Sequence, residues 1–161
     1  MLPTQFLSDQ SPLQCGDAVA AIITVEDGRY LMQRRDDIPR IYYPGHWGCF
    51  GGAVSPGEDK GAALLRELEE ELEWQSGIGV EFVNFDFDLS HLGQGRYYRK
   101  YYEMTVSEAE VSRLTLHEGA EMQLIAPETL FALPLVPYDS FAMWLHVARH
   151  RFAPRFHTHA K

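Results

Sequence analysis

This chain of 161 residues has little cysteine, no excess of positive charge and no long apolar stretch. Its two cysteines, Cys15 and Cys49, form no metal-binding or redox spacing, so we expect reduced thiols and a cytoplasmic protein. No run of about 18 apolar residues is present to span a membrane, and the first residues lack the basic-then-apolar layout of a signal peptide. A formal net charge of −9 argues against general binding to nucleic acids or membrane surfaces. A phosphorylated small molecule stays compatible, because a bound divalent cation would reverse the local field.

The order of apolar segments predicts one α/β domain over residues 1–161, with an N-terminal arm (1–16) and a loose tail (152–161). Strands are expected from period-two alternation and β-branched content at residues 17–25, 29–35, 46–50, 80–89, 96–106 and 121–125. A final helix is expected from a cap at Asp139 or Ser140 to about Arg151, with the apolar stripe Phe141, Trp144, Leu145 and Ala148.

The densest pattern is a glycine pair, a turn and then a helix that packs five glutamates into seven residues (67–73). Asp59 precedes this helix, where its carboxylate can accept hydrogen bonds from the free amides of the first turn. Glu67, Glu70 and Glu71 have the i, i+3 and i+4 spacing that brings side chains together on one helix face. Like charges at this spacing repel each other, and hard oxygen ligands are what Mg²⁺ or Mn²⁺ requires.

A solvent-exposed acidic face is the alternative interpretation, because runs of charge usually face water. Three neighbouring features favour a metal site instead. They are Arg66 beside the cluster, Glu58 in the preceding turn, and the glycine pair Gly51 and Gly52.

This stretch resembles the Nudix box, G-x5-E-x7-R-E-U-x-E-E-x-G-U, in which U is aliphatic or aromatic. The matching residues are Gly52, Glu58, Arg66, Glu67, Leu68, Glu70, Glu71 and Trp74. One position departs from the pattern, because Glu73 stands where the box has its final glycine. That glycine normally ends the helix, so we expect the helix to continue towards Gly77 or Gly79, which are better C-cap residues.

The resemblance implies the Nudix fold, an α/β/α sandwich with a central mixed β-sheet. It also implies hydrolysis of a nucleoside diphosphate linked to some group X, with Mg²⁺ or Mn²⁺ as cofactor. The metal ligands that it implies are Glu67, Glu70 and Glu71, with the Gly51 carbonyl as a further oxygen ligand. Glu58 is expected to pair with Arg66 and orient these ligands.

The family often takes one more carboxylate from a late loop, as a metal ligand or general base. Glu118 and Glu121 are the candidates, and we favour Glu118 because it precedes Gly119 in a loop, whereas Glu121 opens a predicted strand. The residues expected to act in catalysis are therefore Arg66, Glu70, Glu71 and Glu118.

Three arginines are candidates for substrate binding. Arg34 and Arg35 end a strand that borders the phosphates in this family, although they are also readable as an exposed pair neutralised by Asp36 and Asp37. Arg99 lies among tyrosines in the segment 97–102, where aromatic rings beside a cation suit a base and a phosphate. Ordinary sheet packing accounts for those tyrosines equally well.

Two functions from different classes follow. The first is a metal-dependent pyrophosphatase, and the second is a Nudix-fold module that senses a nucleotide metabolite without cutting it. The complete charged set of the box favours the enzyme. The proline-bearing loop 36–45 and Phe50 favour a conjugate such as a nucleotide sugar, with hydrolysis of nucleoside triphosphates or oxidised nucleotides as the alternative. The expected partner is thus a small nucleoside diphosphate derivative; a homodimer is compatible, since many relatives are homodimers.

Overall fold

The computed structural model describes residues 16–39, 41–93 and 95–152. The predicted arm up to residue 15 and the tail from residue 153 lie outside this part of the chain. The elements in chain order are β1 (Ala18–Val25), β2 (Tyr30–Arg34), β3 (Trp47–Gly48), α1 (Lys60–Leu72), β4 (Val80–Asp88), the short 3-10 helix η2 (Ser90–Leu92), β5 (Arg96–Val106), α2 (Glu108–Val111), β6 (Glu121–Ile125), α3 (Pro127–Leu130) and α4 (Pro137–Phe152). None of the helices in these ranges is long and apolar enough to cross a membrane.

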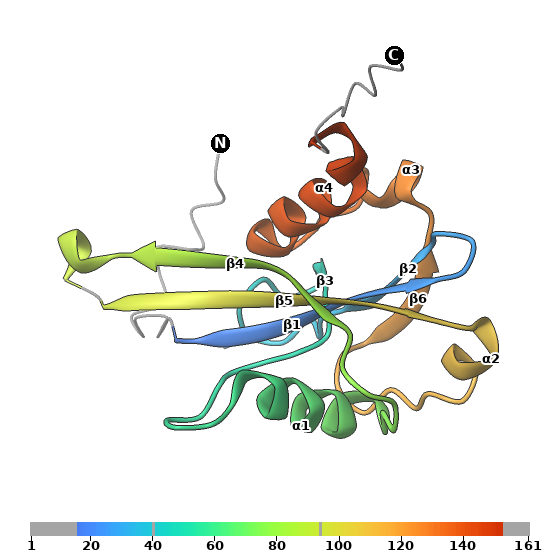
Figure 1. The fold of residues 1–161 in the computed structure, drawn as a ribbon, viewed down its shortest axis with the longest axis horizontal. Helices are drawn as coiled ribbons and strands as arrows, with labels where there is room; N and C mark the ends of the chain where they lie inside the picture. The colour runs from blue at the N-terminus through green and yellow to red at the C-terminus, as the bar shows by residue number, and fades with distance from the viewer. Residues whose placement is uncertain (1–15, 40, 94, 153–161) are drawn as a thin grey trace, which may run out of the picture.

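The six strands form one mixed sheet with the order β3-β2-β1-β5-β4, and β6 pairs with β2. The central pair β1 and β5 is parallel, whereas β2, β3, β4 and β6 join the sheet in antiparallel pairs. Helix α1 lies against one face of the sheet and α4 against the other (Figure 1). The predicted α/β/α sandwich with a mixed sheet is therefore confirmed.

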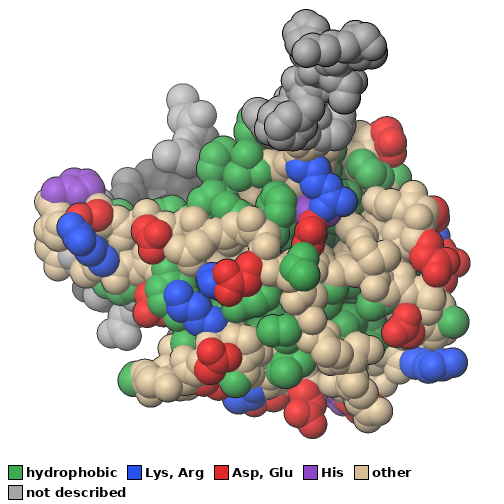
Figure 2. All heavy atoms as spheres, in the orientation of Figure 1, with side chains coloured by type: hydrophobic (Ala, Val, Ile, Leu, Met, Phe, Trp, Pro, Cys, Tyr) green, Lys and Arg blue, Asp and Glu red, His purple; other side chains and the backbone are tan. Residues whose placement is uncertain are grey.

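The core forms two layers because successive residues of β1 point to opposite faces of the sheet. Val19 and Ile23 pack on the α1 side, whereas Ala20 and Ile22 pack on the α4 side. Burying an aliphatic side chain of this size contributes roughly 1.5–3 kcal/mol. The central strands therefore hold the helices firmly on both faces. On the surface shown in Figure 2, basic side chains are interspersed with acidic ones and form no continuous patch.

The end of α1 differs from the prediction, because the helix stops at Leu72 instead of continuing towards Gly77. Glu73 adopts the left-handed conformation, with φ 54° and ψ 37°. Its amide donates to the Glu69 carbonyl at 2.9 Å, and the Trp74 amide donates to the Leu68 carbonyl at 3.3 Å. The bond from Glu73 to Glu69 is the single 5→1 hydrogen bond of the αL C-cap motif. The buried Trp74 side chain, 6% exposed in the α1-side core, explains why the chain turns here.

The final helix also differs from the prediction. It starts at Pro137, so Asp139 lies inside the first turn, and its carboxylate is buried instead of capping the helix. Phe141 and Trp144 from the predicted apolar stripe are about half exposed, and Met143 is among the residues that face the sheet instead. The face of α4 that meets the sheet therefore differs from the predicted apolar stripe. It also carries two polar residues, Asp139 and His146, whose side chains form hydrogen bonds with residues of β5.

Candidate active site

The glycine pair after β3 brings the backbone close to α1. Gly51 has φ 126°, a conformation that favours glycine, and a Cβ there would collide with the Val19 carbonyl of β1. At Gly52 a Cβ would collide with the carboxylate of Glu67. Gly51 therefore requires glycine, whereas a side chain at Gly52 would displace the Glu67 carboxylate from its place beside the loop.

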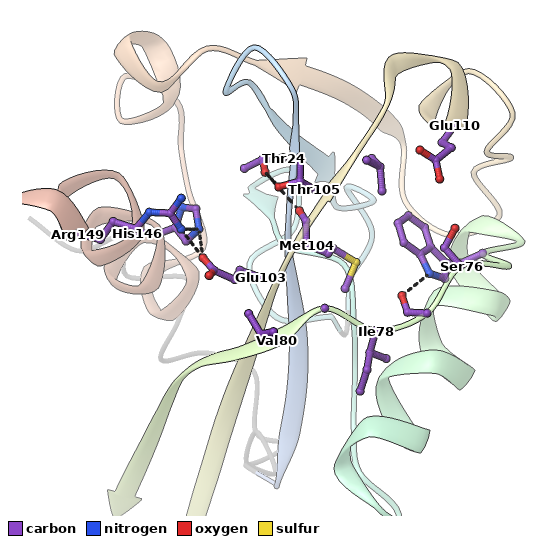
Figure 3. A pocket seen from close by; sticks show the side chains of 14 residues that line it. Thr24, Ser76, Ile78, Val80, Glu103, Met104, Thr105, Glu110, His146 and Arg149 are labelled. Atoms are coloured by element: carbon purple, nitrogen blue, oxygen red, sulfur yellow. Dashed lines mark hydrogen bonds and ion pairs between the residues drawn. The ribbon is translucent and has the colours of Figure 1, made fainter.

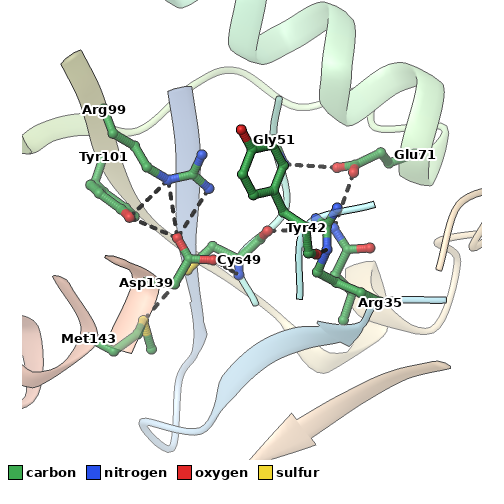
Figure 4. A network of polar contacts seen from close by, with 10 residues as sticks. Arg35, Tyr42, Cys49, Gly51, Glu71, Arg99, Tyr101, Asp139 and Met143 are labelled. Carbon is green, nitrogen blue, oxygen red and sulfur yellow. Dashed lines mark hydrogen bonds and ion pairs between the residues drawn. The ribbon is translucent and has the colours of Figure 1, made fainter. Parts of the chain in front are cut away.

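Glu71 is the most buried acid of the helix, with 5% of the residue exposed. Its carboxylate accepts hydrogen bonds from the Gly51 amide at 2.8 Å and from Nε2 of Gln33 at 3.1 Å (Figure 4). Burial raises its pKa to about 7, the two hydrogen bonds oppose this rise, and the charges of Glu118 and Glu67 add to it. Glu71 is thus a carboxylate in a site that lacks compensating positive charge.

Arg66 connects helix α1 to the preceding loop through side-chain hydrogen bonds. Its Nε and Nη2 donate to the two oxygens of Glu58 at 2.9 and 3.0 Å, and Nη1 donates to Glu67 at 2.8 Å. Nη2 also donates to the Ala53 carbonyl at 3.0 Å. Hydrogen bonds from Arg66 and from the Ser55 amide hold the pKa of Glu58 at about 2. The expected pairing of Glu58 with Arg66 is therefore present, and Glu67 is oriented by the same guanidinium.

The carboxylates of Glu67, Glu70 and Glu71 are the type of ligand that a divalent cation prefers, but their side-chain conformations do not surround a common ion position. Within the described residues, no three His, Cys, Asp or Glu side chains form a group that already surrounds an ion position. Glu67 bonds to Arg66, and the largely exposed side chain of Glu70 lies 3.6 Å from the same guanidinium. Nevertheless, the charges of Glu67 and Glu118 both raise the pKa of Glu71. This repulsion among hard oxygen donors is what a divalent cation would remove.

The two candidates for the late carboxylate have different surroundings. Glu121 begins β6 directly opposite Arg34 in register, and the two side chains form an ion pair at 3.0 Å. Glu118 lies in the preceding loop and is close enough to influence the pKa of Glu71. Glu121 is therefore already paired, and the choice of Glu118 as the late carboxylate stays a prediction.

The predicted substrate arginines are each engaged by protein groups. Arg34 pairs with Glu121 instead of Asp36 or Asp37, and Nε of Arg35 donates to the Tyr42 carbonyl at 2.7 Å (Figure 4). Burial raises the pKa of the Tyr138 phenol in α4, and the positive charges of Arg99 and Arg35 oppose that rise. Arg34 and Arg35 are therefore both already engaged by protein groups.

Arg99 belongs to a buried network with Asp139 (Figure 4). One oxygen of Asp139 accepts from Arg99 Nη2 at 3.1 Å and from the Tyr101 hydroxyl at 2.7 Å, and the other accepts from the Cys49 amide at 3.0 Å. The Tyr138 ring covers the guanidinium, with its centroid at 4.3 Å. Arg99 is therefore mostly enclosed, and its contact with a substrate stays a prediction.

Gln33 and Asp139 also hold groups of this region in place, and the sequence did not predict either role. Gln33 follows Leu31 on the same face of the strand by alternation, and a polar residue next to a buried apolar one was the available signal. Asp139 had no such signal, because an acid near a helix start is normally a cap. Only the packing of α4 on the sheet shows that its carboxylate is buried.

A separate cavity of about 470 Å³ lies between the end of α1, β5 and α4 (Figure 3). No residue expected in the active site lines it. Its buried histidine, His146, bonds to Glu103 at 2.8 Å on one ring nitrogen and to the Tyr30 hydroxyl at 2.8 Å on the other. These polar groups satisfy one another, so we do not place the active site there.

Comparisons with known proteins show the family of this chain and the likeness of its fold to solved structures. The NUDIX domain family model matches residues 16–151. The chain is 31% identical to the CTP pyrophosphohydrolase of Escherichia coli K12 over 123 residues, which are 76% of this chain and 84% of the relative. The crystal structure of the MutT protein from Methanosarcina mazei Go1 has TM-score 0.66 and 22% identity, over 86% of this chain and 98% of that one. The NUDIX domain of Shewanella oneidensis NrtR, solved with ADP ribose, has TM-score 0.61 and 17% identity, over 95% of this chain and 100% of that one.

The family match covers nearly all of the described residues, and the CTP pyrophosphohydrolase is 31% identical over most of its own length. The chain therefore belongs to the NUDIX domain family and is a Nudix pyrophosphohydrolase.

Proposed function

We propose that this protein uses Mg²⁺ or Mn²⁺ to hydrolyse a pyrophosphate bond in a nucleotide. The single observation that carries the proposal is the environment of Glu71. Its carboxylate is 5% exposed and lies near two further negative charges, with its pKa raised to about 7. An uncompensated acid in such a place is costly unless it binds a cation.

Glu67, Glu70 and Glu71, with the Gly51 carbonyl and Glu118, would hold the cation. When bound, the ion supplies positive charge to the phosphate oxygens and acidity to a coordinated water. Arg66 holds Glu67 and, through Glu58 and the Ala53 carbonyl, fixes the loop that follows the glycine pair. The glycine pair lets the Gly51 backbone reach the glutamates. These contacts preorganise the site before substrate arrives.

Glu118 is proposed as the general base, because a carboxylate on a loop can come within hydrogen-bond reach of an attacking water. Its position near Glu71 supports this role. Glu70 is the alternative base, since its largely exposed side chain is accessible to a water molecule.

The substrate's nucleoside is proposed to lie on the α4 side, near Arg35, Arg99 and Tyr138. The segment Cys49–Gly51 links this region to the glutamates, because the Cys49 amide donates to Asp139 and the Gly51 amide donates to Glu71. Aromatic rings and guanidinium groups together suit a base and its phosphates. Arg34, which pairs with Glu121, would need to exchange partners to reach a phosphate.

For the substrate class, a nucleoside triphosphate is proposed first, because the relative with 31% identity is a CTP pyrophosphohydrolase. A nucleotide sugar is the second candidate, supported by the proline-bearing loop 36–45. A reduced, cytoplasmic setting belongs to the same proposal, and the buried thiol of Cys49 suits it.

The deciding experiment compares nucleoside triphosphates with nucleotide sugars, each with and without Mg²⁺ or Mn²⁺. A triphosphate is expected to give the nucleoside monophosphate and pyrophosphate, whereas a nucleotide sugar would give the monophosphate and a sugar phosphate. Glu71→Gln is the matched control, because it removes one charge and keeps the side-chain shape. Hydrolysis that is equally fast without metal, or unaffected by this substitution, would refute the proposed site.

A further inference from the structure

Glu73 has a backbone conformation that suits glycine, and glycine is what the Nudix box has at this position. Its φ of 54° is one of two positive values among the non-glycine residues described. A side chain is disfavoured in the left-handed region because Cβ approaches the following carbonyl oxygen. The glutamate therefore introduces backbone strain at the end of α1.

The Glu73 carboxylate contacts a loop that is distant in sequence. Its Oε1 lies 2.7 Å from Nε2 of His117, and Nε2 is the donor because an ionised carboxylate only accepts. The backbone of the same loop also meets the helix end. The His117 amide donates to the Glu71 carbonyl at 2.9 Å, and the Thr115 amide donates to the Leu72 carbonyl at 3.3 Å. Residues 115–117 thus satisfy carbonyls that a helix end leaves without partners.

The loop has a second anchor just beyond Glu118. Gly119 has φ 96°, and a Cβ there would lie 2.8 Å from Oε1 of Gln33. The Ala120 amide donates to the Arg34 carbonyl at 2.8 Å. The backbone on both sides of Glu118 is therefore anchored, to β2 through Ala120 and to the end of α1 through His117. This anchoring keeps the charge of Glu118 near Glu71.

We propose that Glu73 is a positioning residue, whose hydrogen bond to His117 holds the loop that carries Glu118 against the end of α1. In this chain the helix-ending position links the metal-binding helix to the late carboxylate, a link that glycine cannot make. The proposal rests on the proposed function in so far as Glu118 acts in hydrolysis.

Three substitutions distinguish the effect of the strained Glu73 backbone from the effect of its side-chain contact with His117. Glu73→Ala removes the carboxylate and keeps a Cβ in the left-handed region. Glu73→Gln keeps an oxygen that accepts from His117, and Glu73→Gly removes both the strain and the contact. Glu69→Ala is the matched control for charge, because Glu69 lies one turn earlier on α1 and is exposed.

The first measurement is hydrogen exchange of the His117 amide in the protein without added metal. Glu73→Ala and Glu73→Gly are expected to speed this exchange by about two- to fivefold, as for loss of other half-exposed side-chain contacts. Glu73→Gln and Glu69→Ala are expected to leave it unchanged. Glu73→Gly should also raise the melting temperature, which separates loop opening from loss of global stability.

The second measurement is steady-state hydrolysis. Glu73→Ala is expected to lower kcat by about two- to fivefold with little change in KM, because a loosened Glu118 acts less often in the transition state. Adding His117→Ala to Glu73→Ala should lower kcat no further than either change alone.

Unchanged exchange in Glu73→Ala would overturn the proposal, and so would an equal loss of kcat in Glu69→Ala. Exchange requires neither metal nor substrate. An inactive wild-type protein would therefore refute the proposed function, whereas unchanged exchange refutes the role of Glu73.

Discussion

Replacing Glu71 by glutamine is expected to stabilise the metal-free protein at neutral and higher pH. The wild-type carboxylate is 5% exposed and must give up its proton there to become a charge near Glu67 and Glu118. Glutamine has the same shape and carries no charge. The oxygen of the new glutamine can still accept the hydrogen bond from the Gly51 amide. If the side-chain amide of Gln33 flips, its oxygen can accept a hydrogen bond from the nitrogen of the new glutamine.

The magnitude follows from the pKa of Glu71, which rises from 4.5 to about 7 on folding. At about 1.4 kcal/mol for each pKa unit, this rise corresponds to about 3 kcal/mol. Between these two values the folded protein binds a proton that the unfolded chain has lost. Wild-type stability should therefore fall, relative to Glu71→Gln, as pH rises from about 4.5 to about 7, and the difference should then stay constant.

The assay is urea unfolding of both proteins at pH 5 and pH 8 in the presence of a chelator. The free-energy difference in favour of Glu71→Gln should grow by up to about 3 kcal/mol between these pH values. Millimolar Mg²⁺ should then reverse the order at pH 8, because the wild-type protein binds it more tightly. A difference that is independent of pH, or that favours the wild type at pH 8 without metal, would refute the account of this site.

Three other predictions address the metal, the base and the buried network. Mg²⁺ or Mn²⁺ should raise the melting temperature of the wild type but not of Glu67→Ala/Glu71→Ala; an equal rise in both would place the ion elsewhere. In hydrolysis assays Glu118→Gln should lower kcat by about 10²–10⁴-fold with little change in KM, and Glu121→Gln should be mild; the reverse order would move the base. Asp139→Ala should lower the unfolding free energy by about 3–5 kcal/mol in urea titrations, because it leaves a buried guanidinium unpaired, and a loss below about 1 kcal/mol would contradict that pairing.

The sequence by itself determined the elements whose signals are local. The alternation in β1, β5 and β6 gave strand positions that agree with the structure to within a residue or two. Helix α1 was recognisable because its cap at Asp59 and the spacing of its glutamates are short-range features. The pairing of Glu58 with Arg66 also followed from the box, since both residues lie within one loop-helix unit.

Only the tertiary structure decided the features that depend on contacts between distant segments. The helix was predicted to pass Glu73 because glycine is the usual signal for an end, but burial of Trp74 in the core outweighs the strain at Glu73. Asp139 was predicted as a cap because a local rule assigns acids there. Its carboxylate instead meets Arg99 of β5, 40 residues away in sequence.

The same limit applies to the choice between Glu118 and Glu121. Both stand near one glycine in sequence, and no local spacing tells which of them faces α1. The register of β6 against β2 pairs Glu121 with Arg34, whereas the loop before β6 bonds to the last carbonyls of α1 and brings Glu118 near Glu71. Strand register and helix-end hydrogen bonds join residues far apart in the chain, so they are fixed only when the sheet and the helix pack together.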